Sequence, residues 1–322
     1  MRLLAKQDVL TIGALDRTQI EAVFESARAA RDNPSRYARA LAGKSGILIF
    51  EKPSLRTRVT FEVGLARLGG HPVYFDHSSS RLGEREPIRD YAKNLERWVD
   101  VIVARVFSHA AVEELAAHAS IPVINALSDL HHPCQALADY LTLADHFGGL
   151  RGLRLAYVGD GNNVCHSLMQ AGAALGVGVT VVCPKGYEPD SALVTEAQRT
   201  ASAMGCEVVI GNDPEMVQGH QAIYADTWVS MGDEHESAAR HRAFRPYQVD
   251  IRRLNAAGSG AVFMHCLPAH RGEEVTAEVI DSPRSLVYDQ AENRLHVQNG
   301  LLLHLLGRSD VTISPGSVNN PD

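Results

Sequence analysis

Apolar positions along the chain fall into short runs that alternate with longer stretches of helical periodicity. The run at residues 46–49 is bounded by polar residues and has the length of one buried strand. Similar runs occupy residues 73–75, 101–105, 122–125, 153–158, 179–182, 206–210, 222–225 and 261–264. Strands and helices that alternate in this way are typical of an α/β fold, in which helices cover both faces of a parallel sheet.

The same alternation predicts two domains. A glycine-flanked segment at 149–152 separates two strand–helix series, and a chain of 322 residues is longer than one core usually supports. We expect a first domain at residues 1–148 and a second at 149–291. A leucine-rich helix at about 292–308 should pack against the first domain, and residues 309–322 form a tail. The predicted fold is thus two doubly wound domains joined by long interdomain helices.

The turn after the first apolar run is a candidate anion site. Residues 50–58 read Phe-Glu-Lys-Pro-Ser-Leu-Arg-Thr-Arg and precede a helical pattern. Free N–H groups and the positive end of the helix dipole would meet there. Ser54 and Thr57 add hydroxyl donors, and Arg56 and Arg58 add forks suited to phosphate or carboxylate. These residues alone equally allow an ordinary strand-to-helix turn whose arginines pair with nearby acids.

Polar residues also follow other predicted strands. Arg105 ends one apolar run, Asp226 follows another, and His265 and Cys266 follow a third. The carboxyl ends of parallel strands are where doubly wound sheets bind ligands. We therefore expect these side chains to belong to one or two ligand sites.

Composition narrows the function classes. The net charge of −7 gives no basic footprint, which argues against nucleic acid as a partner. Five cysteines without a C-x-x-C pair disfavour a disulfide framework and fit a reducing cytoplasm. The amino terminus lacks the apolar core of a signal peptide, and no apolar run approaches the ~20 residues that span a bilayer. We expect a soluble, cytoplasmic protein that does not bind membranes.

Two segments resemble metal or nucleotide sites only superficially. His131, His132 and Cys134 lie close together in sequence, but a second cluster that would complete a tetrahedral set is missing. Gly159 and Gly161 follow a strand, but Val164 stands where a dinucleotide fingerprint has its third glycine. We therefore predict neither a metal nor an organic cofactor.

Taken together, four motifs closely resemble those of the ornithine carbamoyltransferases. They are residues 54–58 (Ser-Leu-Arg-Thr-Arg), 132–135 (His-Pro-Cys-Gln), Asp226 with 230–232 (Ser-Met-Gly), and 265–268 (His-Cys-Leu-Pro). The resemblance covers residues 8 to 308. It implies transfer of the carbamoyl group of carbamoyl phosphate to the δ-amine of L-ornithine, giving citrulline and phosphate as in arginine biosynthesis or a urea-cycle-type step. It also implies a carbamoyl-phosphate domain followed by an ornithine domain, in a homotrimer with active sites at subunit boundaries.

The resemblance also assigns residues. It places carbamoyl phosphate against Ser54, Leu55, Arg56, Thr57, Arg81, Arg105, His132, Gln135, Cys266, Leu267 and Arg294. It places ornithine against Asn163, Asp226, Ser230 and Met231. Among these residues, Arg105, His132 and Cys266 are the implied catalytic groups. We expect Cys266 to orient the δ-nitrogen as a thiol or thiolate, and not to act as a covalent nucleophile, because a neutral amine can attack the carbonyl directly.

The chain departs from the family pattern at three positions. Leu55 stands where threonine is frequent, Pro87 where serine is frequent, and Arg81 where a glutamine or histidine often reaches a neighbouring subunit's phosphate. Leu55 can still bind through its backbone N–H, and Arg81 is either such a contact or a simple surface arginine. The alternative functions are carbamoyl transfer to another amine, such as aspartate, an N-acylornithine or putrescine, and a non-catalytic relative that binds a phosphate-containing metabolite.

Overall fold

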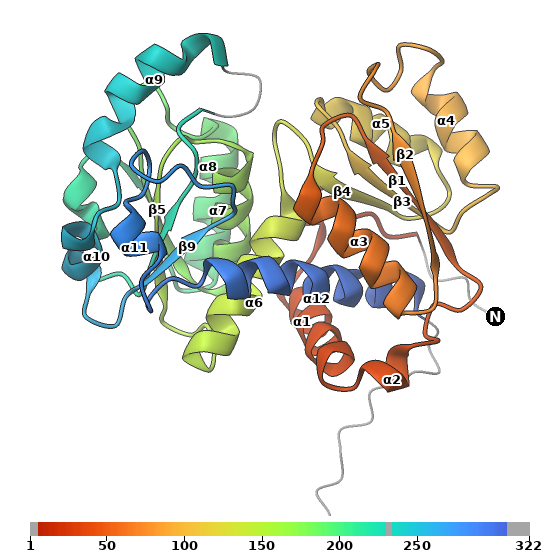
Figure 1. The fold of residues 1–322 in the computed structure, drawn as a ribbon, viewed down its shortest axis with the longest axis horizontal. Helices are drawn as coiled ribbons and strands as arrows, with labels where there is room; N and C mark the ends of the chain where they lie inside the picture. Colours follow the sequence, from red (N-terminus) through yellow and green to blue (C-terminus); the bar gives the residue numbers. More distant parts are fainter. Residues whose placement is uncertain (1–5, 230–233, 308–322) are drawn as a thin grey trace, which may run out of the picture.

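Two parallel β-sheets form the framework of the molecule (Figure 1). The computed structural model describes residues 6–229 and 234–307. The first sheet has the order β2-β1-β3-β4, with bounds β1 (Ser45–Phe50), β2 (His71–Asp76), β3 (Val101–Arg105) and β4 (Val123–Leu127). The second has the order β7-β6-β5-β8-β9, with bounds β5 (Arg154–Val158), β6 (Gly178–Val182), β7 (Val208–Gly211), β8 (Ala222–Ala225) and β9 (Val262–His265). Neighbouring strands pair in parallel, which confirms the predicted α/β class.

Helices cover both faces of the sheets. Their bounds are α1 (Arg17–Asp32), α2 (Pro34–Tyr37), α3 (Leu55–Arg67), α4 (Ile88–Leu95), α5 (His109–His118), α6 (Pro133–Phe147), α7 (Asn163–Leu175), α8 (Ser191–Ala203), α9 (Ser237–Phe244), α10 (Ile251–Ala257), α11 (Ala277–Ile280) and α12 (Val287–Leu306). Leu48 and Phe50 of β1 pack into a cluster with α1, α3 and α12, whereas Ile47 and Ile49 pack into another with α4 and α5. Alternate side chains of one strand thus enter two cores. Within the described ranges, no helix combines the length and apolar composition of a bilayer-spanning helix.

Strand order places a crevice at the carboxyl end of each sheet. Strand β1 pairs with β2 on one side and β3 on the other, and Phe50 is the register partner of Arg105. Strand β5 likewise pairs with β6 and β8. At these points the loops that follow two neighbouring strands turn to opposite faces of the sheet. The space beyond the strand ends therefore stays open for a ligand. The candidate anion site at residues 50–58, which we call the anion cradle, follows β1, and Arg105 ends β3; the two flank one of these positions.

Helices α6 and α12 cross between the two sheets (Figure 1). Helix α12 packs against α1, α3 and α6, and α6 also packs against α7 of the second half. The Tyr140 hydroxyl of α6 donates to the Leu168 carbonyl oxygen of α7 at 2.9 Å. One continuous apolar cluster therefore runs from the first sheet to the second. The predicted domain boundaries at residues 148 and 291 stay predictions.

Two helices begin earlier than the sequence pattern indicates. Helix α12 begins at Val287, not near residue 292. The sequence pattern does not reveal this start, because the buried polar residues Gln290, Asn293 and Arg294 interrupt the apolar periodicity of its inner face. Helix α3 begins at Leu55, not at residue 59. Its first turn, residues 55–58, is mostly polar and adds nothing to the apolar periodicity. The sequence signal for the start of the helix is therefore the capping residue Ser54 alone.

Close packing of α12 on α1 generates the first prediction. A Cβ atom at Gly300 would lie 2.4 Å from the Val23 carbonyl oxygen, a backbone atom that cannot move aside alone. We expect Gly300→Ala to lower the free energy of unfolding by about 1–3 kcal/mol, although alanine is the better helix former. Gly260→Ala, with nothing within 4 Å of the new methyl group, should change it by less than about 0.5 kcal/mol. Urea unfolding measures both, and equal stabilities would contradict the packing argument.

Candidate active site

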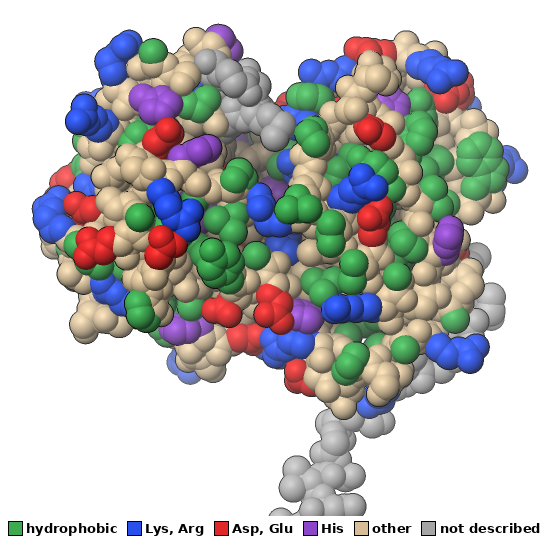
Figure 2. Space-filling view, in the orientation of Figure 1, with side chains coloured by type: hydrophobic (Ala, Val, Ile, Leu, Met, Phe, Trp, Pro, Cys, Tyr) green, Lys and Arg blue, Asp and Glu red, His purple; other side chains and the backbone are tan. Residues whose placement is uncertain are grey.

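A cavity of about 440 Å³ lies between the carboxyl ends of the two sheets. Figure 2 shows the hollow between the two halves, with Lys and Arg side chains in its wall. Its lining includes twelve of the site residues that the sequence analysis predicted: Ser54, Leu55, Arg56, Thr57, Arg105, His132, Gln135, Asn163, Asp226, Cys266, Leu267 and Arg294. The structure thus brings residues from both halves of the chain into one site.

The anion cradle is the first turn of α3. The Ser54 Oγ caps this helix by accepting from the Thr57 N–H at 3.3 Å. The N–H groups of Leu55 and Arg56 precede the first intrahelical donors, so a ligand can accept from them. The Leu55 side chain is 75% exposed, which fits a contribution through the backbone alone. A leucine is therefore compatible with anion binding at this position.

Arg56 and Arg58 have different surroundings. The expectation that both guanidinium groups face the anion site was wrong for Arg58. Arg56 lines the cavity, and burial lowers the pKa of its guanidinium. Arg58 lies 3.5 Å over the ring of Tyr74 and pairs with Glu62 at 3.2 Å. Arg58 is absent from the cavity lining, and its contacts with Tyr74 and Glu62 hold it away from the cavity.

Two further arginines are almost completely buried in the cavity wall. Arg294 of α12 donates through Nη1 to the Gln135 Oε1 at 2.5 Å and through Nη2 to the Thr57 Oγ1 at 3.0 Å. Arg105 ends β3, and among the described residues its Nε has no hydrogen-bond partner. Burial, with the positive charges of Arg294 and Arg56, lowers the pKa of Arg105 to about 9. All three arginines thus gain from an anion placed between them.

His132 and Gln135 lie at the start of α6, facing these arginines. The His132 backbone N–H donates to the Ser167 Oγ at 2.8 Å, which fixes the helix start against α7. Burial and the charges of Arg294, Arg105 and Arg56 lower the pKa of His132 well below its ordinary value. The imidazole is therefore neutral near pH 7 and can donate one N–H to an oxygen that gains negative charge.

The second sheet supplies an acidic and a thiol group. Asn162 accepts through Oδ1 from the backbone N–H groups of Val164 and Cys165, and donates through Nδ2 to the Asp226 Oδ2 at 2.8 Å. The Cys266 Sγ donates to the other oxygen of Asp226 at 3.0 Å. Burial and the Asp226 carboxylate raise the pKa of Cys266 well above its ordinary value. Cys266 is therefore a thiol, not a thiolate.

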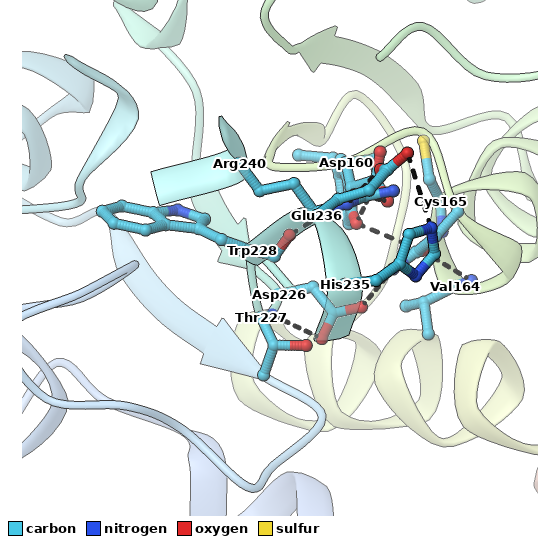
Figure 3. A network of polar contacts seen from close by, with 11 residues as sticks. Asp160, Val164, Cys165, Asp226, Thr227, Trp228, His235, Glu236 and Arg240 are labelled. Atoms are coloured by element: carbon cyan, nitrogen blue, oxygen red, sulfur yellow. Dashed lines mark hydrogen bonds and ion pairs between the residues drawn. The ribbon is translucent and has the colours of Figure 1, made fainter. Parts of the chain in front are cut away.

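The segment that follows Asp226 is held by an ion-pair network (Figure 3). Arg240 of α9 pairs with Asp160 at 2.9 Å and Glu236 at 3.1 Å, and its Nη1 donates to the Trp228 carbonyl oxygen at 3.4 Å. These contacts anchor the chain two residues before Ser230. The predicted ornithine contacts Ser230 and Met231 lie outside the described residues.

Asn163 and Arg81 have contrasting positions. Asn163 lines the cavity and donates through Nδ2 to the Ser128 carbonyl oxygen at 2.5 Å, which joins the two halves. Arg81 does not line the cavity. Its guanidinium lies 3.1 Å over the ring of Phe107, and its neighbour Leu82 donates its N–H to the buried Glu51 carboxylate. Within its own chain, Arg81 therefore lies outside the site.

Among the described residues, two groups of side chains have a composition suited to a metal. Asp226, His265 and Cys266 place ligand atoms within 4.8 Å of one another, as do His270, Glu273 and Glu274. Both ring nitrogens of His265 are occupied, since Nδ1 accepts from the Leu267 N–H at 2.9 Å and Nε2 donates to the Glu274 Oε1 at 3.1 Å. These hydrogen bonds shape the turn after β9 and would have to break for His265 to ligate an ion.

Sequence reasoning missed several residues around the cavity, of which Lys52, Asn162 and Asp139 bear on its chemistry. Lys52 and Asn162 line it, and Asp139 supports it from α6. Lys52 belongs to the motif at residues 50–58, and its place in that motif was an available signal. Asn162 had no signal of its own that would distinguish it from the adjacent Asn163. Asp139 is fully buried and accepts from the Gln135 Nε2 at 2.8 Å. Burial raises the pKa of Asp139 to about 7. The available signal was an acidic residue flanked on both sides by apolar residues, Ala138 and Tyr140, within a predicted helix.

Comparisons with known proteins agree with this geometry. A family model described as the aspartate/ornithine carbamoyltransferase carbamoyl-P binding domain matches residues 7–145, and one for the Asp/Orn binding domain matches residues 151–305. Ornithine carbamoyltransferase from Shewanella oneidensis is 51% identical over 296 residues, which cover 92% of this chain and 98% of that protein. The one from Pyrococcus horikoshii is 53% identical over 270 residues, or 84% and 85% of the two chains. The solved structure of ornithine carbamoyltransferase from Pyrococcus furiosus matches with a TM-score of 0.90 at 47% identity, covering 95% and 98%. The chain belongs to the aspartate/ornithine carbamoyltransferase family.

Proposed function

We propose that this protein transfers the carbamoyl group of carbamoyl phosphate to the δ-amine of L-ornithine, forming L-citrulline and phosphate. The observation that carries the proposal is the single cavity in which the arginine-lined cradle of the first half faces Asp226 and Cys266 of the second. A phosphate dianion and an amino acid fit the two sides by charge. Relatives about 50% identical over most of the chain bear the name ornithine carbamoyltransferase.

Carbamoyl phosphate occupies the first half of the cavity in this proposal. Its phosphate accepts from the first-turn N–H groups of α3, from Ser54 and Thr57, and from Arg56. Its carbonyl oxygen accepts from Arg105 and the neutral His132, and the carbamoyl amide donates to the Gln135 Oε1 and to backbone oxygen at Cys266 and Leu267. Charge grows on the carbonyl oxygen during attack and on the phosphate as it leaves. Fixed donors at both places stabilise the transition state more than the substrate.

Ornithine occupies the second half. Asp226 provides a counter-charge for an ammonium group, and Asn163, Ser230 and Met231 contact the α-amino acid part. The Cys266 thiol lies 3.0 Å from the Asp226 carboxylate, where it orients the δ-nitrogen without forming a covalent bond. The amine attacks in its neutral form, and holding it beside the carbonyl replaces a bimolecular encounter. No metal or organic cofactor is needed for these steps.

The domain roles follow from the same assignment. Residues 1–148 with the helix at 292–308 bind carbamoyl phosphate, and residues 149–291 bind ornithine. The reaction product suits arginine biosynthesis. We also assign the protein to the cytoplasm, because each of its five cysteines is a free thiol in the structure.

The assembly that we propose is a homotrimer whose sites lie at subunit boundaries. Strand β2 lies at one edge of the first sheet. Phe75 of this strand is 41% exposed, and Trp98, after α4, is 69% exposed. An apolar edge strand favours contact with a second copy of the chain. Arg81 lies outside its own cavity, so in this arrangement it reaches the phosphate site of the neighbouring subunit.

Substrate selectivity tests the proposed reaction. We expect ureido-product formation with carbamoyl phosphate and ornithine to exceed that with N-acetylornithine, putrescine or aspartate by at least about 100-fold in kcat/KM, because a site that pairs each polar group of its substrate discriminates strongly against analogues. A colorimetric assay of the purified protein measures this. Preference for another amine would overturn the acceptor assignment alone, and no reaction with any of the four would favour a non-catalytic relative.

The cradle is tested by Arg56→Ala with Arg58→Ala as a matched control from the same turn. Removal of one charge-assisted donor set costs about 1.5–3 kcal/mol, so we expect the KM for carbamoyl phosphate to rise about 10- to 100-fold in Arg56→Ala. Arg58 contacts Tyr74 and Glu62, and its loss should leave that KM within about twofold of the original value. Steady-state kinetics measure both, and equal effects would argue against the cradle.

Subunit mixing tests the role of Arg81. Arg56→Ala and Arg81→Ala proteins are each expected to be weakly active as homotrimers. In random 1:1 mixed trimers, about a quarter of the sites combine an intact Arg56 with an intact Arg81 from the neighbour, so about a quarter of the original activity should return. Recovery is measured after the mixture is unfolded and refolded together. Trimers that are shown to be mixed yet remain inactive would make Arg81 a surface residue.

A further inference from the structure

A chain of buried hydrogen bonds links α6 to α12 behind the cavity. Asp139 of α6 and Gln290 of α12 are almost completely inaccessible to solvent, and neither lines the cavity. The Gln290 Nε2 donates to the Asp139 Oδ1 at 2.6 Å, and the Gln135 Nε2 donates to the same oxygen at 2.8 Å. One carboxylate oxygen thus holds two amides that come from different helices.

The chain ends at both substrate half-sites. On one side, the Gln135 Oε1 accepts from Arg294, which also donates to the Thr57 hydroxyl of the cradle. On the other side, the Gln290 Oε1 accepts at 3.0 Å from the backbone N–H of His265, the residue before Cys266. The path therefore runs from the anion cradle to the end of β9.

The donor and acceptor types leave little freedom in this chain. The Asp139 Oδ1 accepts from the NH₂ groups of both glutamines, so the amide oxygens of both point away from it. The Gln135 oxygen then faces Arg294 and the cavity, and the Gln290 oxygen faces His265. Turning one amide over would leave buried groups unpaired, which is costly in a site of low dielectric constant.

We propose that Asp139 and Gln290 are positioning residues that couple the carbamoyl-phosphate half-site to the amino acid half-site. A phosphate that draws Arg294 toward it acts through Gln135, Asp139 and Gln290 on the backbone at His265, and so on Cys266. Linkage requires the reverse effect to be equally large. This inference rests on the proposed function, because that function defines the two ligands.

The coupling is measured by calorimetric titration with L-norvaline, which keeps the α-amino acid group and three-carbon side chain of ornithine but lacks the reactive amine. The readout is the ratio of the norvaline Kd without carbamoyl phosphate to that with saturating carbamoyl phosphate. We expect the unmodified protein to show a ratio in the range of about 5–150. In Gln290→Met, the ratio should fall toward one, while the Kd for carbamoyl phosphate alone changes by less than about twofold.

Asn293→Leu is the matched control. The Asn293 Nδ2 donates at 2.9 Å to the Thr142 Oγ1, so this residue is also a buried hydrogen-bonded link from α12 to α6. It leads to no substrate contact, and Thr142 keeps its bond to the Ala138 carbonyl oxygen. We expect the original ratio in Asn293→Leu. An equal loss in both variants would assign the coupling to helix packing in general, and an unchanged ratio in Gln290→Met would overturn the proposal directly.

Asp139→Asn and Asp139→Leu give a second test that does not depend on the folding of Gln290→Met. Asparagine retains an oxygen that can accept from both glutamines, so part of the coupling should survive; leucine removes the acceptor, and the coupling should disappear. Equal ratios in these two variants would overturn the positioning role. If the unmodified protein binds neither ligand and forms no citrulline, the proposed function is overturned. If it forms citrulline normally but the ratio of norvaline Kd values is the same in the unmodified protein and in the Asp139 and Gln290 variants, only this inference is overturned.

Discussion

The concentration of positive charge beside the first sheet is the constraint on which the site depends. The charges of Arg294 and Arg56 lower the pKa of Arg105, and that of Arg56 lowers the pKa of Arg294. Within the described chain, none of the three arginines forms an ion pair with a carboxylate. A carboxylate partner would neutralise the charge that an anionic substrate uses. The structure instead holds Arg294 through neutral acceptors, the Thr57 hydroxyl and the Gln135 amide. The guanidinium is thereby oriented while its charge remains available.

Neutral groups can orient the Arg294 guanidinium only if other residues hold those neutral groups in place. Gln135 can hold Arg294 only because Asp139 fixes the other end of its amide, and Asp139 in turn depends on α12. In the second half, Asn162 performs the corresponding task for Asp226, since it caps α7 and donates to the carboxylate with the same side chain. Asp139 is fully buried and Asn162 is half-buried, and removal of either would free the side chain that it holds to turn.

The sequence predicted the strands of the sheets and the residues of the cavity, but not the polar residues Asp139 and Asn162 that hold the cavity side chains in place. Strands buried on both faces appear as continuous apolar runs, and strand ends that carry Arg105, Asp226 and Cys266 point to a ligand site by topology alone. The start of α12 and the role of Asp139 were missed because buried polar residues interrupt the apolar pattern, and their partners are 151 residues away in the chain. Arg58 was misplaced because a guanidinium suits an anion site by its chemistry, whereas its contacts with Tyr74 and Glu62 are visible only in the structure. Such long-range polar contacts become visible only when the helices are packed.

The protonated state of Cys266 has a consequence for the protein's resistance to oxidation. Peroxides and disulfides react with the thiolate, and Asp226 together with burial holds this sulfur in the thiol form. The same hydrogen bond that directs the sulfur toward the amino acid side of the cavity thus lowers its reactivity. A more acidic thiol at the same position would present more thiolate at neutral pH and would react faster with such oxidants.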